Sequence, residues 1–314
     1  MARYRNRLPQ LDGGLYLTDG GIETSLIFLD GLDLPYFAAF DLLKDSEGRD
    51  ALRRYFRRYA EIARRNGTGF ILESATWRAS PDWGAKLGYS EEALAEANVL
   101  AVGMLAGLRE ELETGRTHMV VSGCIGPRGD GYDPGAAMTP AEAEDYHAFQ
   151  VRIFAETEAD MVTAITMTNA AEATGIAWAA RAAKLPVAIS FTVETDGRLP
   201  TGQPLGEAIG EVDAATGRTP AYFMVNCAHP THFAHVFEDA PWLRRVRGIR
   251  ANASKCSHAE LDAAPDLDAG DPFELGRDYA AIRDRFPWIN VLGGCCGTDH
   301  RHIEQIAGAC LVPA

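Results

Sequence analysis

The sequence lacks long hydrophobic runs and an excess of positive charge, and each absence excludes a class of protein. Lys and Arg together number 30 in the 314 residues, against 44 Asp and Glu, so the formal net charge is −14. A nucleic-acid or anionic-membrane partner requires a basic surface, so neither partner is expected. No uninterrupted apolar run approaches the roughly 18–20 residues that cross a membrane, so no membrane segment is expected either.

Cysteine is scarce, and the N-terminus carries no secretion signal. The chain has 6 Cys in 314 residues, too few for a disulfide scaffold, and free thiols suit a reducing intracellular compartment. Arg3, Arg5 and Arg7 make the N-terminus basic, but no apolar segment follows them, so they do not begin a signal peptide. We therefore expect a soluble, cytoplasmic protein, and a homo-oligomer is compatible with its sequence.

Low-complexity linkers and short internal repeats are also absent, whereas the material for a large core is present. Hydrophobic residues make up 46% of the chain and charged residues 24%, a balance typical of folded globular proteins. Alternating α/β barrels commonly reach this length as one unit, so we expect a single domain over residues 1–314.

Strand-like apolar runs alternate with helix-like segments along the whole chain. We expect strands at 15–19, 70–74, 118–123, 160–165, 187–192, a sixth ending at 227, and then 247–251 and 290–292. We expect helices at 49–65, 90–113, 139–158, 170–184, 206–215, 272–285 and 299–311, with a less regular one near 232–236. Strands that alternate with helices in this way predict a parallel sheet, here closed into a (β/α)8 TIM-type barrel, with a doubly wound open sheet as the alternative.

Two adjacent thiols follow the last expected strand, in Leu292-Gly-Gly-Cys-Cys-Gly-Thr-Asp299. Neighbouring side chains on a strand point to opposite faces, so Cys295 and Cys296 can share one ion only on a sharply bent backbone. The flanking glycines allow that bend. Cys227 ends another strand-like run, and the three thiols together would form a zinc site with an open fourth position. Buried spectator thiols or a vicinal disulfide are the alternatives.

A closed barrel explains how thiols so far apart in the sequence can meet, because the sixth and eighth strands end at the same mouth. Hydrolytic zinc sites use His or mixed His and carboxylate ligands, which leave the metal electrophilic enough to ionise water. Three thiolates donate more electron density and favour a soft fourth ligand, such as a substrate thiol. The pattern therefore predicts attack of sulfur on a carbon, hence methyl or alkyl transfer.

The motifs that carry this chemistry resemble the homocysteine S-methyltransferase family, which includes the betaine enzyme and the homocysteine domain of methionine synthase. The matching segments are Asp19-Gly-Gly-Ile-Glu-Thr24, Gly123-Cys-Ile-Gly-Pro127, Asn226-Cys227, Asn252-Ala253 and Gly293-Gly-Cys-Cys-Gly297. The resemblance extends from about Leu15 to Ile306. It implies a (β/α)8 barrel, a zinc ion on Cys227, Cys295 and Cys296, and methyl transfer to a thiol, most simply homocysteine giving methionine.

The same resemblance implies where the substrate lies. Contacts are expected from Asp19, Gly20, Gly21, Ile22, Glu73 and Asn252. Asp19 would face the ammonium group of the acceptor, and the backbone N–H groups of Gly20 to Ile22 would face its carboxylate.

One residue departs from the family pattern. Members that use homocysteine end the fourth strand in a Phe-Glu-Thr-like segment whose Glu also binds the ammonium, whereas this chain has Ile165 there. An apolar side chain cannot pair with an ammonium, and loss of a buried ionic partner costs several kcal/mol. Either Glu73, Glu194 or Asp19 compensates, or the acceptor is another small thiol or a selenol.

Other residues near strand ends have both structural and functional interpretations. Trp77 and Trp83 either pack in the core or wall a methyl-donor site, since aromatic faces attract onium cations. Glu73 and Arg78 either form a structural ion pair or lie at the mouth. His229 is a weaker candidate ligand, because its spacing from Cys227 draws it away from the other thiols.

The sequence does not specify the methyl donor. No folate or cobalamin module is evident, so we expect the donor to enter the same mouth or to come from a partner chain. The alternative from another functional class is a non-catalytic barrel in which four protein ligands enclose a structural zinc.

Overall fold

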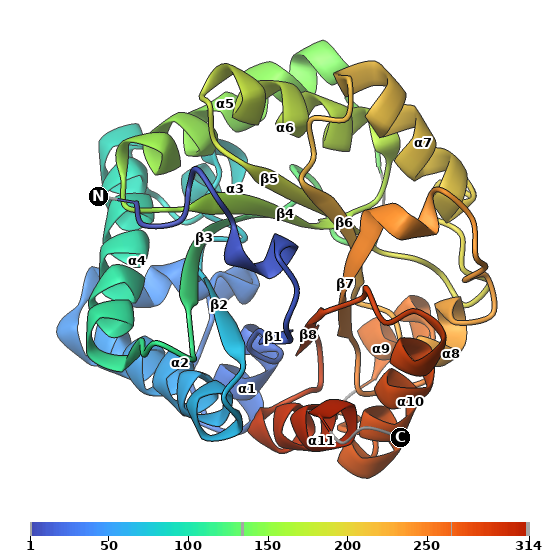
Figure 1. Ribbon diagram of the computed structural model, residues 1–314. Coiled ribbons are helices and arrows are strands. Elements are labelled where there is room, and N and C mark those ends of the chain that lie inside the picture. Colours follow the sequence, from blue (N-terminus) through green and yellow to red (C-terminus); the bar gives the residue numbers. More distant parts are fainter. Residues whose placement is uncertain (1, 133–134, 265, 312–314) are drawn as a thin grey trace.

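The chain forms a closed barrel of parallel strands surrounded by helices (Figure 1). The computed structural model describes residues 2–132, 135–264 and 266–311. The strands are β1 (Tyr16–Leu17), β2 (Gly69–Glu73), β3 (Met119–Ile125), β4 (Met161–Met167), β5 (Val187–Phe191), β6 (Tyr222–Asn226), β7 (Val246–Ala251) and β8 (Val291–Gly294). Each pairs in parallel with the next, and β8 pairs with β1, which confirms the predicted barrel and excludes the open sheet.

Helices follow the strands and cover the outside of the barrel. They are α1 (Ile22–Phe28), α2 (Ser46–Asn66), α3 (Pro81–Lys86), α4 (Glu91–Leu112), α5 (Pro140–Glu156), α6 (Ala170–Ala182), α7 (Leu205–Thr216), α8 (Pro230–Phe233), α9 (His258–Ala263), α10 (Pro272–Arg285) and α11 (His300–Leu311). Four 3-10 turns accompany them: η1 (Pro9–Leu11), η2 (Pro35–Phe37), η3 (Ala39–Lys44) and η4 (Leu243–Arg245). The long helices match the predicted ranges within a few residues.

The sixth expected helix is much shorter than its counterparts. Near 232–236 we expected a helix, and the structure has only the four-residue α8. An aromatic cluster covers the barrel in its place: Phe237 packs on Phe233 at a ring-centroid distance of 5.3 Å and on Trp242 at 6.3 Å. Large rings therefore supply the apolar cover that a longer helix would provide.

The amino ends of the strands form a closed, apolar end of the barrel. Inward-facing side chains pack together there: Tyr16, Ile71, Val120, Met161, Tyr222, Met224 and Val291. Leu8 joins this cluster, and Gln10 of η1 is fully buried. The N-terminal segment, dark blue in Figure 1, crosses this end of the barrel. Among the described residues, this packing closes the amino ends of the strands, and the cavity lies at their carboxyl ends, where TIM barrels place their active sites.

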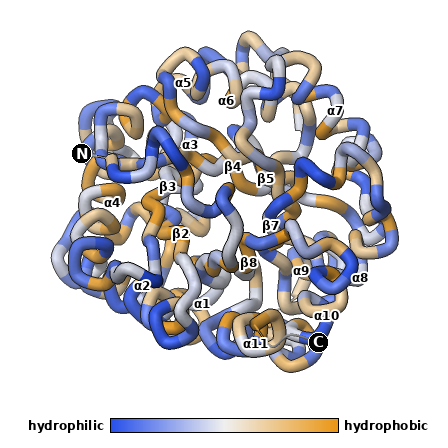
Figure 2. Tube along the Cα trace, viewed as in Figure 1, coloured by the Kyte–Doolittle hydropathy of each residue, from blue (hydrophilic) through white to orange (hydrophobic). Residues whose placement is uncertain are grey.

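Hydrophobic residues follow the strands and the helix faces that meet them, whereas hydrophilic residues mark the outer turns (Figure 2). The α2 helix illustrates the pattern, because it buries Leu52, Phe56 and Tyr59 and exposes Arg54 and Arg58. Within the described residues, no helix combines the length and the apolar character needed to cross a membrane.

Candidate active site

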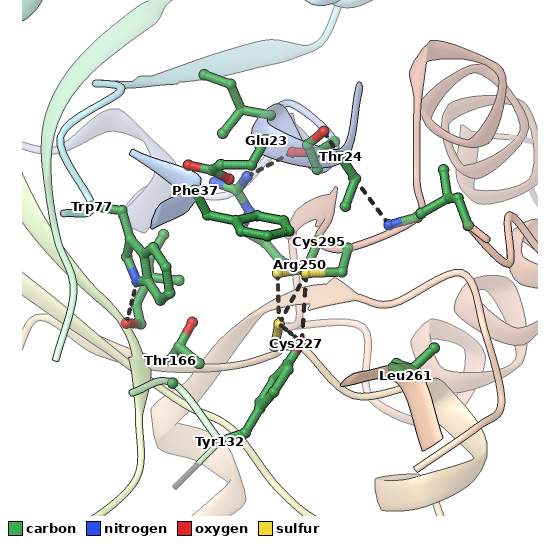
Figure 3. A pocket seen from close by; sticks show the side chains of 18 of the residues that line it. Glu23, Thr24, Phe37, Trp77, Tyr132, Thr166, Cys227, Arg250, Leu261 and Cys295 are labelled. Carbon is green, nitrogen blue, oxygen red and sulfur yellow. Dashed lines mark hydrogen bonds between the residues drawn. The ribbon is translucent and has the colours of Figure 1, made fainter. Parts of the chain in front are cut away.

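Three cysteines from two strand ends meet at the mouth of the barrel (Figure 3). Cys227 follows β6, and Cys295 and Cys296 follow β8. The Sγ of Cys227 lies 3.1 Å from that of Cys295 and 3.6 Å from that of Cys296. All three sulfur atoms lie within 4.8 Å of one another, and we call them the thiol cluster. The structure thus brings together the three predicted thiols, despite 68 positions between Cys227 and Cys295.

The intervening strand β7 sets the spacing of the thiol cluster. The backbone N–H of Cys227 donates to the carbonyl of Arg250 at 3.1 Å, and the N–H of Cys295 donates to the carbonyl of Ala251 at 2.8 Å. Two neighbouring β7 residues therefore anchor the two loops on either side. Cys227 has a φ of 58°, a left-handed conformation that a side-chain-bearing residue adopts only when its surroundings hold it there.

Asn226 supplies part of that restraint. Its Oδ1 accepts from the backbone N–H of Thr166 at 2.9 Å and from Ser190 Oγ at 2.6 Å. Its Nδ2 donates to Thr166 Oγ1 at 2.8 Å. Because Asn226 is fully buried, these bonds to β4 and β5 lock the end of β6 and hence the direction of the Cys227 side chain.

The carbonyl of Cys227 is held as firmly as its N–H. Asn252 Nδ2 lies 3.0 Å from this oxygen, and His258 Nε2 lies 2.6 Å from it. Asn252, a predicted substrate contact, is thus placed behind the thiol cluster and is absent from the described residues that line the cavity. Its position supports the orientation of Cys227.

Tyr132 approaches the thiol cluster from the loop after β3 (Figure 3). Its hydroxyl lies 3.3 Å from Cys227 Sγ and 3.5 Å from Cys296 Sγ, and its ring stacks on His258 with centroids 4.0 Å apart. Burial and the nearby sulfur atoms raise the pKa of Tyr132 well above its usual value, so the hydroxyl keeps its proton and donates. Sequence reasoning missed this residue, because nothing in Gly126–Tyr132 signals which side chain reaches the mouth.

All six cysteines are free thiols, so the vicinal disulfide is not formed. Hydrogen bonds from Cys227 and Cys296 lower the pKa of Cys295 well below its usual value, and the charge of Arg250 acts in the same direction. These contacts favour a thiolate within the thiol cluster. Thiolates are the form in which cysteines bind metal, so the cluster is prepared for a soft cation.

A buried ion-pair cluster of Asp19, Glu73 and Arg250 lies beside the thiols. Arg250 donates to Asp19 Oδ1 and to Glu73 Oε2, each at 2.8 Å. The hydroxyl of Tyr55 donates to the other Asp19 oxygen at 3.0 Å. Although burial lowers the pKa of Arg250, the charges of Asp19 and Glu73 raise it further, so the guanidinium stays charged. Glu73 therefore pairs with Arg250, and the interpretation that paired it with Arg78 is wrong.

Above both clusters lies a cavity of about 410 Å³. Trp77, Phe37 and Leu261 give it apolar walls (Figure 3). Ile165 also lines it. The Trp77 ring is fixed by a hydrogen bond from its Nε1 to the Ile165 carbonyl at 3.3 Å. Trp83, the other tryptophan considered for this wall, packs outside the described lining.

The turn from β1 to α1 lines the same cavity through Asp19, Gly20, Gly21 and Ile22. A Cβ on Gly21 would lie 2.5 Å from the Cys295 carbonyl, so only glycine allows this turn to approach the thiol loop. The Gly21 N–H donates to the Thr298 carbonyl at 3.0 Å and is engaged within the protein.

Three further residues with side chains that can bind a metal, His229, Cys256 and Cys124, are not part of the thiol cluster. His229 Nδ1 pairs with Thr231 Oγ1 at 2.9 Å, and His229 is not part of the group that could hold a metal. Cys256 is exposed. Cys124 is buried and lines the cavity floor, where burial raises its pKa well above the usual value and keeps it a neutral thiol.

Comparison with known folds adds a structural relative. The metallated form of the homocysteine methyltransferase MmuM from Escherichia coli superposes with a TM-score of 0.72 at 18% identity, covering 97% of this chain and 99% of that chain. The oxidized form of MmuM gives a TM-score of 0.72 at 18% identity, covering 98% and 99%. At this identity the likeness establishes the shared barrel fold.

Comparison of sequences places the chain in a family. No curated protein sequence matches it significantly. The sequence profile described as "Homocysteine S-methyltransferase" matches residues 16–310, which include every strand of the barrel and the whole thiol cluster. The chain therefore belongs to the homocysteine S-methyltransferase family and is a methyltransferase.

Proposed function

We propose that this protein is a zinc-dependent S-methyltransferase that moves a methyl group from a small donor to the sulfur of a small thiol. Homocysteine, which would give methionine, is the first acceptor to test. The observation that carries the proposal is the thiol cluster: three sulfur atoms within 4.8 Å of one another, at the floor of a cavity large enough for small molecules.

The spacing of the sulfur atoms fits zinc. A Zn–S bond of about 2.3 Å and tetrahedral angles require sulfur atoms about 3.8 Å apart. The separations of 3.1 and 3.6 Å approach that value and need only small side-chain adjustments. Among the described residues, no His, Asp or Glu completes a fourth ligand, which supports a catalytic over a structural site. Zinc held by Cys227, Cys295 and Cys296 would ionise an acceptor thiol and leave its sulfur nucleophilic.

The transfer itself is a substitution at the methyl carbon. The acceptor thiol gives its proton to solvent, and its sulfur electron pair forms the new bond to the methyl group. The bond between the methyl group and the donor heteroatom breaks, and its electron pair stays on the donor. The proposal therefore needs only a donor with an activated methyl group, such as a sulfonium or a quaternary ammonium compound.

We assign most of the proposed rate enhancement to the cavity walls, which would align the donor and the acceptor. Complete ionisation of a thiol near pH 7 gains only roughly 10–30-fold, or about 1.4–2 kcal/mol. Alignment of donor and acceptor can contribute about 7–11 kcal/mol. Trp77 and Phe37 offer aromatic faces to an onium methyl donor, and the fixed Trp77 ring is suited to hold it in one orientation.

The experiment is a panel assay on the zinc-loaded protein. Homocysteine and other thiols are combined with S-methylmethionine, S-adenosylmethionine, betaine or methylfolate, and products are identified by mass. X-ray absorption at the zinc edge reports whether a thiol adds a sulfur ligand. A new metal–sulfur bond and a methylated product are expected. An unchanged metal shell with every thiol would favour a structural zinc and overturn the proposal.

A further inference from the structure

The carboxylates expected to bind an acceptor ammonium are already engaged inside the protein. Arg250 donates a hydrogen bond to one oxygen of Asp19 and to one oxygen of Glu73, and the Tyr55 hydroxyl donates to the second oxygen of Asp19. These side chains are buried, so an ammonium would have to displace a charged guanidinium to reach them. That exchange leaves Arg250 without a carboxylate partner, with only the carbonyls of Gly20 and Gly294 as acceptors, and a buried charge without a counter-charge is costly.

The cavity lining includes further acids, namely Asp130, Asp262, Asp266 and Asp268, but not at the end of the fourth strand, where an acid was expected. Ile165 presents an apolar side chain at the position of the family Glu. Glu23 also lines the cavity, but burial raises its pKa to about 8, so it is mostly neutral near pH 7. Glu194, considered from the sequence, pairs with His258 Nδ1 at 3.1 Å and is absent from the described cavity lining.

Arg78, by contrast, is a cation with unused hydrogen-bonding capacity. It lines the cavity, and only 10% of its side-chain surface is exposed. Its Nε and one terminal nitrogen are buried and have no hydrogen-bond partner among the described residues. The other terminal nitrogen forms an ion pair with an Asp130 carboxylate oxygen at 3.7 Å, and that carboxylate is 51% exposed.

The surroundings of Arg78 hold the guanidinium in place. Its central carbon lies 3.7 Å from the Trp83 ring centroid and 4.6 Å from that of Trp77. The aromatic faces fix the orientation of the guanidinium but accept no hydrogen bonds along its edge. Burial lowers the pKa of Arg78, as expected for a cation whose solvation has been removed without full replacement.

We infer that Arg78 binds an anionic group on the acceptor, so that the pocket selects a thiol by its carboxylate. The inference rests on the proposed function and names the substrate class: small thiols with a terminal carboxylate. Planar guanidinium groups match carboxylates in geometry, and charged hydrogen bonds are the strong ones. The cavity is small, so a thiol whose sulfur meets the thiol cluster brings its other end to the cavity wall.

A matched pair of thiols separates the two recognition modes. γ-Mercaptobutyrate is homocysteine without its amino group, and γ-mercaptopropylamine is homocysteine without its carboxylate. Calorimetric titration of the zinc-loaded protein measures the dissociation constant of each. We expect γ-mercaptobutyrate to bind at least about 10-fold more tightly than the amine and as tightly as homocysteine within about 3-fold. Equal binding of the pair, or tighter binding of the amine, would overturn the inference.

Variants assign the preference to Arg78. Arg78→Gln is expected to reduce the ratio between the two thiols to near 1, and Arg78→Lys to retain part of it. Arg128→Gln is the matched control, because Arg128 pairs with Asp82 outside the cavity and the substitution removes the same charge. An unchanged ratio in folded, zinc-loaded Arg78→Gln would assign the preference elsewhere and contradict the role of Arg78. If that variant does not fold, the thiol pair on the native protein and Arg78→Lys still decide the question.

X-ray absorption with the same thiols distinguishes failure of this inference from failure of the proposed function. X-ray absorption reports metal–sulfur bonding for every thiol, whatever its charge. If none of the three thiols bonds to zinc, the proposed function fails. If all bond but the amine is preferred, thiol methylation stands and only the inference about Arg78 fails.

Discussion

The mouth of the barrel contains two clusters of ionisable groups, a partly buried thiol cluster and a buried ion-pair cluster, that differ in whether a further partner can bind. The thiol cluster bonds mainly to itself and to Tyr132, and no carboxylate or imidazole of the described residues completes it. The ion-pair cluster is complete, because Arg250 bridges Asp19 and Glu73. The thiol cluster is therefore the open cluster, which can still bind a ligand, and the ion-pair cluster is the closed cluster, whose partners all come from the protein.

This difference separates chemistry from recognition within one cavity. The three sulfur atoms proposed to bind zinc converge as the motifs predict, whereas the carboxylates expected to bind the acceptor are paired with Arg250. A pocket can therefore keep its reaction while its substrate preference changes, because the two depend on different side chains. Variants that remove a thiol, remove Arg250 or add a carboxylate to the cavity test whether the proposed chemistry and the recognition of the acceptor depend on different side chains.

The largest effect is expected at the open cluster. Cys295→Ser removes a metal ligand, so zinc content should fall below one equivalent and methyl transfer should decrease by more than about 100-fold, since even partners of metal ligands contribute 10–100-fold. The barrel should remain folded, because Cys295 lies beyond the end of β8. Metal content, circular dichroism and product mass measure these effects, with Cys256→Ser, an exposed thiol, as the control. Retained turnover in Cys295→Ser would refute its role as a ligand.

The closed cluster should determine stability more than turnover. Arg250→Met leaves Asp19 and Glu73 buried without a cation, and we expect the free energy of unfolding to fall by about 3–5 kcal/mol at pH 8. Urea unfolding of proteins with equal zinc content measures the loss. Arg244→Met is the control, because its ion pair with Asp239 is exposed and contributes at most about 1 kcal/mol.

The loss in Arg250→Met should depend on pH. Burial raises the pKa of Asp19 and Glu73 in the folded state, and the charge of Arg250 opposes this increase. Without Arg250 both pKa values rise further, so the folded protein binds more protons than the unfolded chain, and the destabilisation grows as pH rises. It should therefore be smaller at pH 6 than at pH 8. A loss that is constant between these values would mean that the two carboxyls do not change protonation.

A carboxylate added to the cavity should restore ammonium recognition. Ile165→Glu places an acid beside the cavity with no arginine assigned to it. We expect the affinity for homocysteine to increase about 10-fold relative to that for γ-mercaptobutyrate, because only homocysteine has an ammonium group to pair with the new acid. Ile165→Gln controls for polarity without charge. If the two affinities change in parallel, the ammonium of homocysteine does not lie near position 165.

Features that depend on local patterns could be predicted from the sequence. The alternation of strands and helices identified the barrel, and Thr139-Pro140-Ala141-Glu142 forms the capping box that begins α5. The convergence of Cys227 with Cys295 and Cys296 followed from strand order alone, since both loops leave the barrel at one end. The short helices α1, α3 and α9 lie in loops, where periodicity is too brief to read.

Pairings between distant residues could not be predicted in the same way. Arg250 and Asp19 are 231 positions apart, and nothing near either residue identifies the other as its partner. In the sequence, Arg250 is one residue of an ordinary strand pattern. Only the closed barrel places it beside Asp19 and Glu73. The roles expected for Asp19 and Glu73 came from resemblance to a family, which did not identify Arg250 as their partner.

We expect the smallest effect from removal of the Tyr132 hydroxyl, which approaches the thiol cluster. Tyr132→Phe removes the donor that lies 3.3 Å from Cys227 Sγ and 3.5 Å from Cys296 Sγ. A single hydrogen bond contributes about 0.5–1.5 kcal/mol, so zinc affinity should fall by only about 2–10-fold, measured by competition with a chelator. Tyr36→Phe, an exposed tyrosine, should have no effect. Complete loss of zinc in Tyr132→Phe would make its oxygen a metal ligand and the thiol cluster a closed site, so the contrast between the two clusters would disappear.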